Sequence, residues 1–482
     1  MMNSRQNKII LFVVAALFFF LNTLTLKDGH MLGGDFAQYV QHSLNILEHK
    51  PYDYGLNLDA WVLCAPGLPL LLAPVIKVFG INLVIMKFLN VLSWLLFGWM
   101  LYKILKDKLD EELAVLAVSA ILLSHFFFIF KQNILTDMPF AFFVTAAIYS
   151  FEKYWRADLP ARRKELIWFI VIALTAFLFR YAGAVLSASA VLYAWFIKKD
   201  RRPVLPVLSG AAAGILAQFL IGASAQGHFA ELPAMTDDWL TLSYLNISYI
   251  LFCFMYFYFP GRTPAELGLQ AMIVPALDLF SLVIVFGLGW MFIRRCRSRE
   301  ISFSEFFFFI YLAGLIIWPL ADGPRYLFPI VGLGWIVLYR ASSRFAVWGK
   351  SALKILAVLI LLVNIAGIAA DIKFNDDELL EPQLQEVFQW VRDNAGGDEA
   401  VMFRYARELG LYTGKPSLTL WFRGTDRRHF STRAKYFDVR YVINDKKRDE
   451  FQLEEGSEGG VILKKIWENE KYRIFEVKKE AH

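Results

Sequence analysis

Charged residues are scarce in this sequence. Asp, Glu, Lys and Arg make up only 20% of its 482 residues, whereas 57% are hydrophobic. A soluble chain of this length would carry about 25% charged residues and would place its apolar positions at amphipathic periods. Here the apolar residues lie in runs that approach or exceed the roughly 20 residues needed to cross a bilayer. The clearest runs are residues 9–26, 81–101, 113–130 and 271–293. The sequence therefore predicts a polytopic α-helical membrane protein.

Cysteine is rare as well. Cys64, Cys253 and Cys296 form no CxxC pair, so neither a disulfide framework nor a cysteine-ligated zinc site is expected. The net charge of +6 does not indicate a nucleic-acid partner. The basic residues cluster in short gaps between apolar runs and form no basic stripe on a soluble segment.

The basic residues predict the orientation of the chain. With a cytoplasmic N-terminus, alternate gaps hold most of the Lys and Arg, as the positive-inside rule requires. Segment 166–197 has basic flanks on both sides, so we expect it to cross twice, with Arg180 and Tyr181 at its outer turn. By the same parity the aromatic run 240–260 does not cross, and lies in the outer interface or re-enters. The result is about 11 spans, the first of them an uncleaved span rather than a signal peptide.

The composition changes after Asp371. Residues 386–394 have the pattern of an amphipathic helix, and residues 400–405, 439–443, 460–466 and 472–477 have that of strands. We therefore expect a transmembrane module at residues 1–371, with a first outer loop at 27–80. Residues 372–482 are expected to form a small extracytoplasmic α/β domain.

A few ionisable residues lie at the predicted outer ends of the spans. They are Asp35, Lys131, Asp137, Arg180 and Arg325. Carboxylates and cations on one face suit a ligand that bears phosphate, together with a group that accepts a proton. Each residue also has a structural interpretation. Asp137 could cap the helix that begins at Met138-Pro139, and Arg325 could be an interfacial anchor.

Several short motifs stand out along the chain: Asp35 with Tyr39, then Ala65-Pro66-Gly67, Asp137-Met138-Pro139-Phe140, Arg180-Tyr181-Ala182-Gly183 and Pro324-Arg325-Tyr326. They resemble motifs of the GT-C superfamily, membrane glycosyltransferases that use polyprenyl-phosphate sugars. The superfamily includes the protein O-mannosyltransferases and the aminoarabinose transferase of lipid A. Residues 405–415 are similar to a segment of the outer domain in some members.

The chain departs from the superfamily at two points. Phe36 follows Asp35 where several branches carry a second acidic residue, so one carboxylate or metal ligand is missing there. Cys64 stands before Ala65-Pro66 where the lipid A branch has a basic residue, which argues against the lipid A substrate.

The resemblance implies an inverting glycosyltransferase that acts on the outer side of the membrane. Asp35 and Asp137 would be catalytic, with Asp35 as the general base. Arg180 and Arg325, and also Lys131, would bind the donor phosphate. The implied acceptor or sugar contacts are Tyr39, Tyr181 and Tyr326.

The implied partners are a polyprenyl-phosphate sugar donor, a lipid, glycan or protein acceptor, and membrane lipid. No cofactor is certain, but a divalent metal at Asp137 is possible. The expected location is the bacterial inner membrane, with the C-terminal domain in the periplasm. Two other interpretations remain open: a lipid or solute transporter or flippase, and a non-catalytic assembly or receptor protein.

Overall fold

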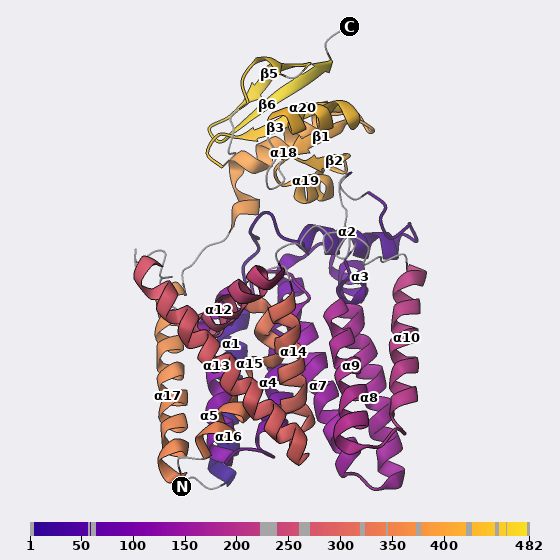
Figure 1. Ribbon diagram of the computed structural model, residues 1–482. Coiled ribbons are helices and arrows are strands. Elements are labelled where there is room, and N and C mark those ends of the chain that lie inside the picture. The colour runs from indigo at the N-terminus through magenta and orange to yellow at the C-terminus, as the bar shows by residue number, and fades with distance from the viewer. Residues whose placement is uncertain are drawn as a thin grey trace.

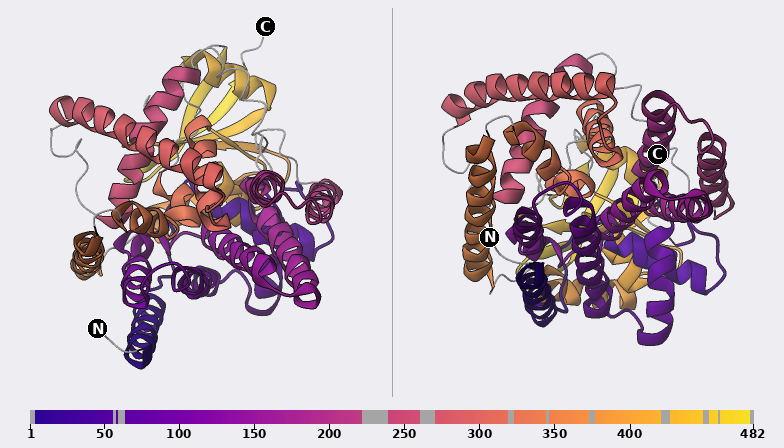
Figure 2. Two further views of the ribbon diagram at one scale, coloured as in Figure 1. Left: turned by 60° about the horizontal axis from the view of Figure 1, so that its bottom comes forward. Right: turned by 90° about the horizontal axis from the view of Figure 1, so that it is seen from below.

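The structure is a computed structural model with a helical bundle at one end and a small α/β domain at the other (Figure 1). It describes residues 4–55, 58, 64–221, 239–259, 270–318, 323–343, 346–372, 377–420, 427–448, 453–458 and 460–479. Seen from below, the sheet of the C-terminal domain lies behind the helices, so the domain covers the end of the bundle (Figure 2).

The bundle contains the predicted apolar spans as helices. They are α1 (Ser4–Leu24), α4 (Leu83–Leu105), α5 (Glu111–Leu122), α6 (His125–Phe130), α7 (Asp137–Arg156), α8 (Leu159–Phe179), α9 (Ala184–Leu192) continued by η2 (Tyr193–Lys198), α10 (Val204–Ile221), α12 (Trp239–Tyr258), α13 (Gln270–Ser298), α14 (Phe303–Ile317), α15 (Phe328–Val331), α16 (Gly334–Ser342) and α17 (Ala346–Asp371). Among the described residues, 6 helices are long and apolar enough to cross a membrane by length and composition. The predicted fold class, a polytopic helical protein with a small C-terminal sheet domain, is confirmed.

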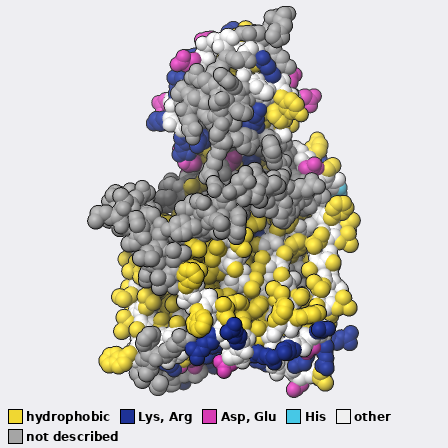
Figure 3. All heavy atoms as spheres, viewed as in Figure 1, with side chains coloured by type: hydrophobic (Ala, Val, Ile, Leu, Met, Phe, Trp, Pro, Cys, Tyr) yellow, Lys and Arg dark blue, Asp and Glu magenta, His cyan; other side chains and the backbone are white. Residues whose placement is uncertain are grey.

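Side-chain colouring separates the two ends of the bundle. On the face shown in Figure 3, a broad apolar band covers the middle of the bundle, and Lys and Arg gather at the edge farthest from the C-terminal domain. A belt of apolar side chains is what contact with hydrocarbon requires.

The helical structure of segment 166–197 is interrupted at the turn that its basic flanks predict. Arg180 has an extended backbone (φ −151°, ψ 137°) between α8 and the short helix η1 (Tyr181–Gly183). Two glycines make this corner compact. A Cβ on Gly183 would lie 2.6 Å from the backbone nitrogen of Phe177, and one on Gly67 would lie 2.7 Å from the Leu178 carbonyl oxygen. The predicted turn at Arg180 and Tyr181 is therefore confirmed, but the helix before it, α8, is longer than predicted, with 21 residues.

The segment between α1 and α4 carries two helices that lie across the end of the bundle rather than along it, α2 (Phe36–Leu47) and α3 (Gly67–Phe79) (Figure 1). Helix α12 packs against other helices of the bundle. Its Asn246 side chain donates to the Trp318 carbonyl at the end of α14 (2.6 Å), and its Phe257 ring lies 6.4 Å from that of Trp94, halfway along α4. Of the two arrangements predicted for residues 240–260, the re-entrant one agrees with these contacts.

The C-terminal domain is a six-stranded sheet flanked by helices. The strands are β1 (Ala400–Phe403), β2 (Ser417–Thr419), β3 (Val439–Asp445), β4 (Gly456–Glu458), β5 (Val461–Glu468) and β6 (Tyr472–Lys479), in the order β2-β1-β3-β6-β5-β4. The pairs β1–β2 and β1–β3 are parallel and the others antiparallel. The helices are η6 (Glu378–Leu380), α18 (Pro382–Asn394), α19 (Ala406–Thr413) and α20 (Arg427–Tyr436).

Strands β1 and β3 are buried on both faces of the sheet, with alternate residues on opposite sides, whereas β5 has an exposed face. Val401 and Phe403 belong to the core that continues through α18 and α19 into the bundle, whereas Ala400 and Met402 join a separate core beneath α20. All four predicted strands and the predicted helix are present. Strands β2 and β4 and helix α19 were not predicted, because each is short.

Candidate active site

Two of the predicted site residues form a buried ion pair. Nη1 of Arg180 lies 2.5 Å from Oδ1 of Asp137, and the Asp137 side chain is only 2% exposed. The residue that caps α7 is Thr136, and Asp137 is the first residue inside the helix. The carboxylate therefore pairs with Arg180 at the turn after α8, and Asp137 is not a simple helix cap.

An aromatic ring connects this pair to Arg325. The ring centroid of Tyr326, in the short helix η4 (Pro324–Leu327), lies 4.8 Å from the Arg180 guanidinium carbon and 5.5 Å from that of Arg325. Gly323, at φ +86°, provides the left-handed turn that begins η4. Two guanidinium groups thus gather around one tyrosine, an arrangement suited to a phosphate.

Asp35 lies at the start of α2 on the same side of the bundle. Its carboxylate makes no capping hydrogen bond to α2. Instead Oδ1 accepts a short hydrogen bond from Nη1 of Arg407, on α19 of the C-terminal domain. The Asp35 side chain stays 37% exposed, in contrast to that of Asp137.

Tyr39 lies between the two acidic residues. Burial raises the pKa of its phenol well above the ordinary value, the Cys64 thiol and the Asp35 carboxylate raise it further, and the Arg180 charge opposes them. The Tyr39 side chain also hydrogen-bonds with those of Cys64 and of Thr136, the residue before Asp137. Burial, followed by Asp35, also raises the pKa of the Cys64 thiol, while Arg407 and Arg180 lower it. Tyr39 and Cys64 therefore join the Asp35 and Arg180 parts into one site.

The two remaining predicted site residues are Lys131 and Tyr181. The Lys131 ammonium, completely buried, donates to the Thr25 hydroxyl (2.6 Å) and lies 3.5 Å from the Phe128 ring centroid. Lys131 follows the last residue of α6, and burial there lowers its pKa to about 6. Tyr181 packs edge to face on Phe177, with ring centroids 6.2 Å apart. None of the contacts described here joins Lys131 to the Asp137–Arg180 pair.

Asp137 is the residue at which a divalent metal was considered possible. Its Oδ2 atom is buried, and no hydrogen bond to it occurs within the described residues. In the same part of the chain, no group of three or more His, Cys, Asp or Glu side chains could hold a metal ion. A metal at Asp137 would thus need other ligands, such as water or substrate oxygens.

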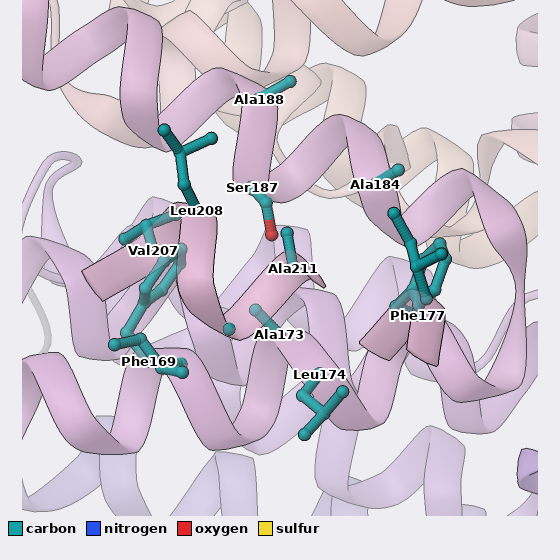
Figure 4. Close-up of a pocket in the computed structure, with 13 residues that line it drawn as sticks. Phe169, Ala173, Leu174, Phe177, Ala184, Ser187, Ala188, Val207, Leu208 and Ala211 are labelled. Carbon is teal, nitrogen blue, oxygen red and sulfur yellow. The ribbon is translucent and has the colours of Figure 1, made fainter. Parts of the chain in front are cut away.

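An apolar cavity of about 190 Å³ lies apart from these charges, between α8, α9 and α10 (Figure 4). The side chains around it include Phe169, Leu174, Phe177 and Leu208, and Ser187 contributes the one hydroxyl seen there. It contains no group suited to acid–base chemistry.

The structure brings together six predicted residues: Asp35, Tyr39, Asp137, Arg180, Arg325 and Tyr326. It adds Arg407 and Cys64, for which sequence reasoning assigned no role. Arg407 belongs to segment 405–415, whose similarity to the outer domain of some GT-C proteins was the one available signal.

Known proteins resemble this chain in sequence over one segment and in fold over most of its length. The family model of dolichyl-phosphate-mannose-protein mannosyltransferases matches residues 64–222, about a third of the chain. No curated protein sequence matches the chain significantly.

Solved structures share the fold over almost the whole chain. The oligosaccharyltransferase AglB of Archaeoglobus fulgidus, in complex with an inhibitory peptide and a dolichol-phosphate, aligns with a TM-score of 0.57 at 13% identity, covering 91% of this chain and 69% of AglB. ArnT of Cupriavidus metallidurans, bound to undecaprenyl phosphate, aligns with a TM-score of 0.56 at 11% identity and covers 98% of both chains. The family match and the shared fold confirm the predicted resemblance to the GT-C superfamily and the predicted class of enzyme, a glycosyltransferase.

Proposed function

We propose that this protein is an inverting glycosyltransferase that moves a sugar from a polyprenyl-phosphate donor to an acceptor at the end of the bundle covered by the C-terminal domain. The observation that carries the proposal is the gathering of a solvent-accessible carboxylate, Asp35, with the guanidinium groups of Arg180 and Arg325 around Tyr39 and Tyr326.

The proposed reaction is a single displacement. Asp35 removes the proton from the hydroxyl or amine of the acceptor, and the acceptor atom attacks the anomeric carbon from the face opposite the phosphate. The bond between that carbon and the phosphate oxygen breaks, and the electron pair leaves with polyprenyl phosphate. Since one displacement reverses the geometry at the carbon, the configuration inverts.

The cations have the task of stabilising the leaving group. The oxygen that leaves carries increasing negative charge, and fixed guanidinium groups stabilise such charge without reorganising. We assign this task to Arg180 and Arg325. Their guanidinium carbons, which lie 4.8 and 5.5 Å from the Tyr326 ring centroid, support the assignment. Lys131 is less suited to stabilising the leaving group, since its side-chain nitrogen donates to Thr25 and burial lowers its pKa.

The two carboxylates differ in exposure, and we assign their roles from this difference. Asp35 is accessible to an acceptor, whereas Asp137 is almost fully buried and paired. We assign the base to Asp35, and to Asp137 the task of holding Arg180 toward the phosphate, with contact to the acceptor or to a divalent cation through its other oxygen. Tyr39, Tyr181 and Tyr326 are the proposed sugar or acceptor contacts.

Separate observations support the proposed donor class and the proposed side of the membrane. AglB and ArnT have been solved with dolichol-phosphate and undecaprenyl phosphate, which supports a lipid-phosphate donor here. The basic edge of the bundle lies opposite the C-terminal domain, which supports a cytoplasmic N-terminus and a site on the outer side. We propose that the membrane is a bacterial inner membrane and that the site faces the periplasm.

The experiment uses the full-length protein in lipid nanodiscs with radiolabelled polyprenyl-phosphate sugars and an acceptor extract. We expect release of free polyprenyl phosphate that depends on the acceptor, and a product whose anomeric configuration, measured by NMR, is opposite to that of the donor. A transporter would move the donor between leaflets without cleaving it. Intact donor after complete incubation, or retained configuration, would contradict the proposal.

A further inference from the structure

We infer that Arg407 is a positioning residue of this active site, which orients the Asp35 carboxylate from the C-terminal domain. The inference rests on the proposed function and extends it, because it makes the outer domain part of the catalytic machinery.

The pairing of Arg407 with Asp35 joins residues 372 positions apart in the chain. Within the described residues, this is the one hydrogen bond to the Asp35 side chain, since Asp35 does not cap α2. The Arg407 side chain is 32% exposed and that of Asp35 is 37% exposed, so the pair lies where a substrate can reach it.

The backbone on both sides of this pair is held in place. The Gly33 N–H donates to Oε1 of Glu408 (2.8 Å), the residue next to Arg407. The Leu32 N–H donates to Oε2 of Glu378 (3.2 Å). Exposed ion pairs usually contribute little, because two long side chains must be ordered to form them. Here the loop that carries Asp35 and the helix that carries Arg407 are already fixed together.

Two further backbone contacts extend this attachment. The Leu379 N–H donates to the His30 carbonyl (3.1 Å), and the Leu58 N–H donates to the Ser417 carbonyl (2.7 Å). The first outer loop is thus attached to η6, α19 and β2 of the domain. An attachment that involves so many backbone groups keeps the Arg407 guanidinium in one place relative to Asp35.

The chemical consequence concerns the two oxygens of Asp35. Arg407 binds Oδ1, which fixes the plane of the carboxylate and leaves Oδ2 to accept the proton of the acceptor. The Asp35 and Arg407 charges both affect the pKa of the buried Cys64 thiol, which Asp35 raises and Arg407 lowers.

The test compares Arg407→Ala with Arg407→Lys and with Arg440→Ala in the sugar-transfer assay. Arg440 is a matched control, because it forms an exposed ion pair with Glu476 (2.7 Å) in the same domain. We expect Arg407→Ala to lower kcat by about 10²-fold, the typical cost of a misplaced catalytic group, with donor KM within twofold of wild type. Free guanidinium ion should restore part of the rate, Arg407→Lys should retain more of it, and Arg440→Ala should match wild type.

The outcomes separate this inference from the proposed function. An active wild-type protein with unchanged kcat in Arg407→Ala overturns the inference alone. The same holds if kcat falls but neither guanidinium nor Arg407→Lys restores any of it while the thermal midpoint drops, because the role is then structural. A wild-type protein that transfers no sugar overturns the proposed function and the inference with it.

Discussion

Oδ1 of Asp137 lies 2.5 Å from Nη1 of Arg180, so the first residue of α7 holds the turn that follows α8. Removing one partner of a buried ion pair leaves an uncompensated charge, which costs about 3–5 kcal/mol. We expect Asp137→Asn to destabilise the protein by an amount near the lower end of this range, because Arg180 retains some exposure.

The measurement is the thermal midpoint in detergent. Asp158→Asn is the matched control, since Asp158 is exposed and its side chain makes no capping hydrogen bond to α8. Equal midpoints for Asp137→Asn and Asp158→Asn would show that the pair contributes nothing to stability.

Donor binding should distinguish Arg325 from Lys131. Arg325→Ala removes a guanidinium beside Tyr326, and the loss of hydrogen bonds to a charged group costs about 1.5–3 kcal/mol, or roughly tenfold or more in Kd. Lys131→Met should have a smaller effect at pH 7.5, because a pKa of about 6 leaves that amine mostly neutral. Binding of labelled polyprenyl phosphate to each variant provides the comparison. A larger effect for Lys131→Met would reverse our ranking of the two residues.

Glu408 should make stability depend on pH. Burial of its carboxyl raises the pKa to about 7, despite the Gly33 N–H and the Arg407 charge, which lower it. An acid whose pKa rises on folding stabilises the folded state below its unfolded pKa, here 4.5, and this contribution is lost as pH rises through about 7. The full difference is on the order of 3 kcal/mol.

We therefore expect the thermal midpoint of the wild-type protein to decrease as the pH rises from 5 to 8. Glu408→Gln keeps an oxygen for the Gly33 N–H but does not titrate, so its midpoint should change less over the same range. Parallel curves for the two proteins would exclude Glu408 as the source of the dependence.

Gly33 should be sensitive to substitution for a backbone reason. Its φ of +83° is unfavourable for other residues by roughly 1–2 kcal/mol, although a Cβ would have room, with Tyr405 Cε1 as its nearest atom at 3.6 Å. Gly33→Ala should lower the transfer rate by displacing the loop that carries Asp35. Gly397→Ala is the matched control, because a Cβ there meets nothing within 4 Å. Similar rates for both variants would mean that this loop tolerates the change.

The elements predicted well are those with a local signal. Apolar runs gave the spans, the basic flanks of segment 166–197 placed the turn at Arg180, and alternation gave four strands. Strand β2 has only three residues, too few to show a period. The pairing of Asp35 with Arg407 depends on how two distant segments dock, and no local pattern encodes that. The candidate residues of the bundle could thus be selected from the sequence, but the pairing of one of them with the C-terminal domain could not.

The central claim is that Asp35 is the base of a glycosyl transfer. Its most direct test is single-turnover transfer from a labelled polyprenyl-phosphate sugar by wild type, Asp35→Asn and Asp53→Asn, the last being an exposed aspartate on the same outer loop. Because general base catalysis contributes about 10²–10⁴-fold, Asp35→Asn should lose at least 10²-fold in rate while still binding donor. Asp53→Asn should match wild type. Transfer by Asp35→Asn at a near wild-type rate would contradict the account.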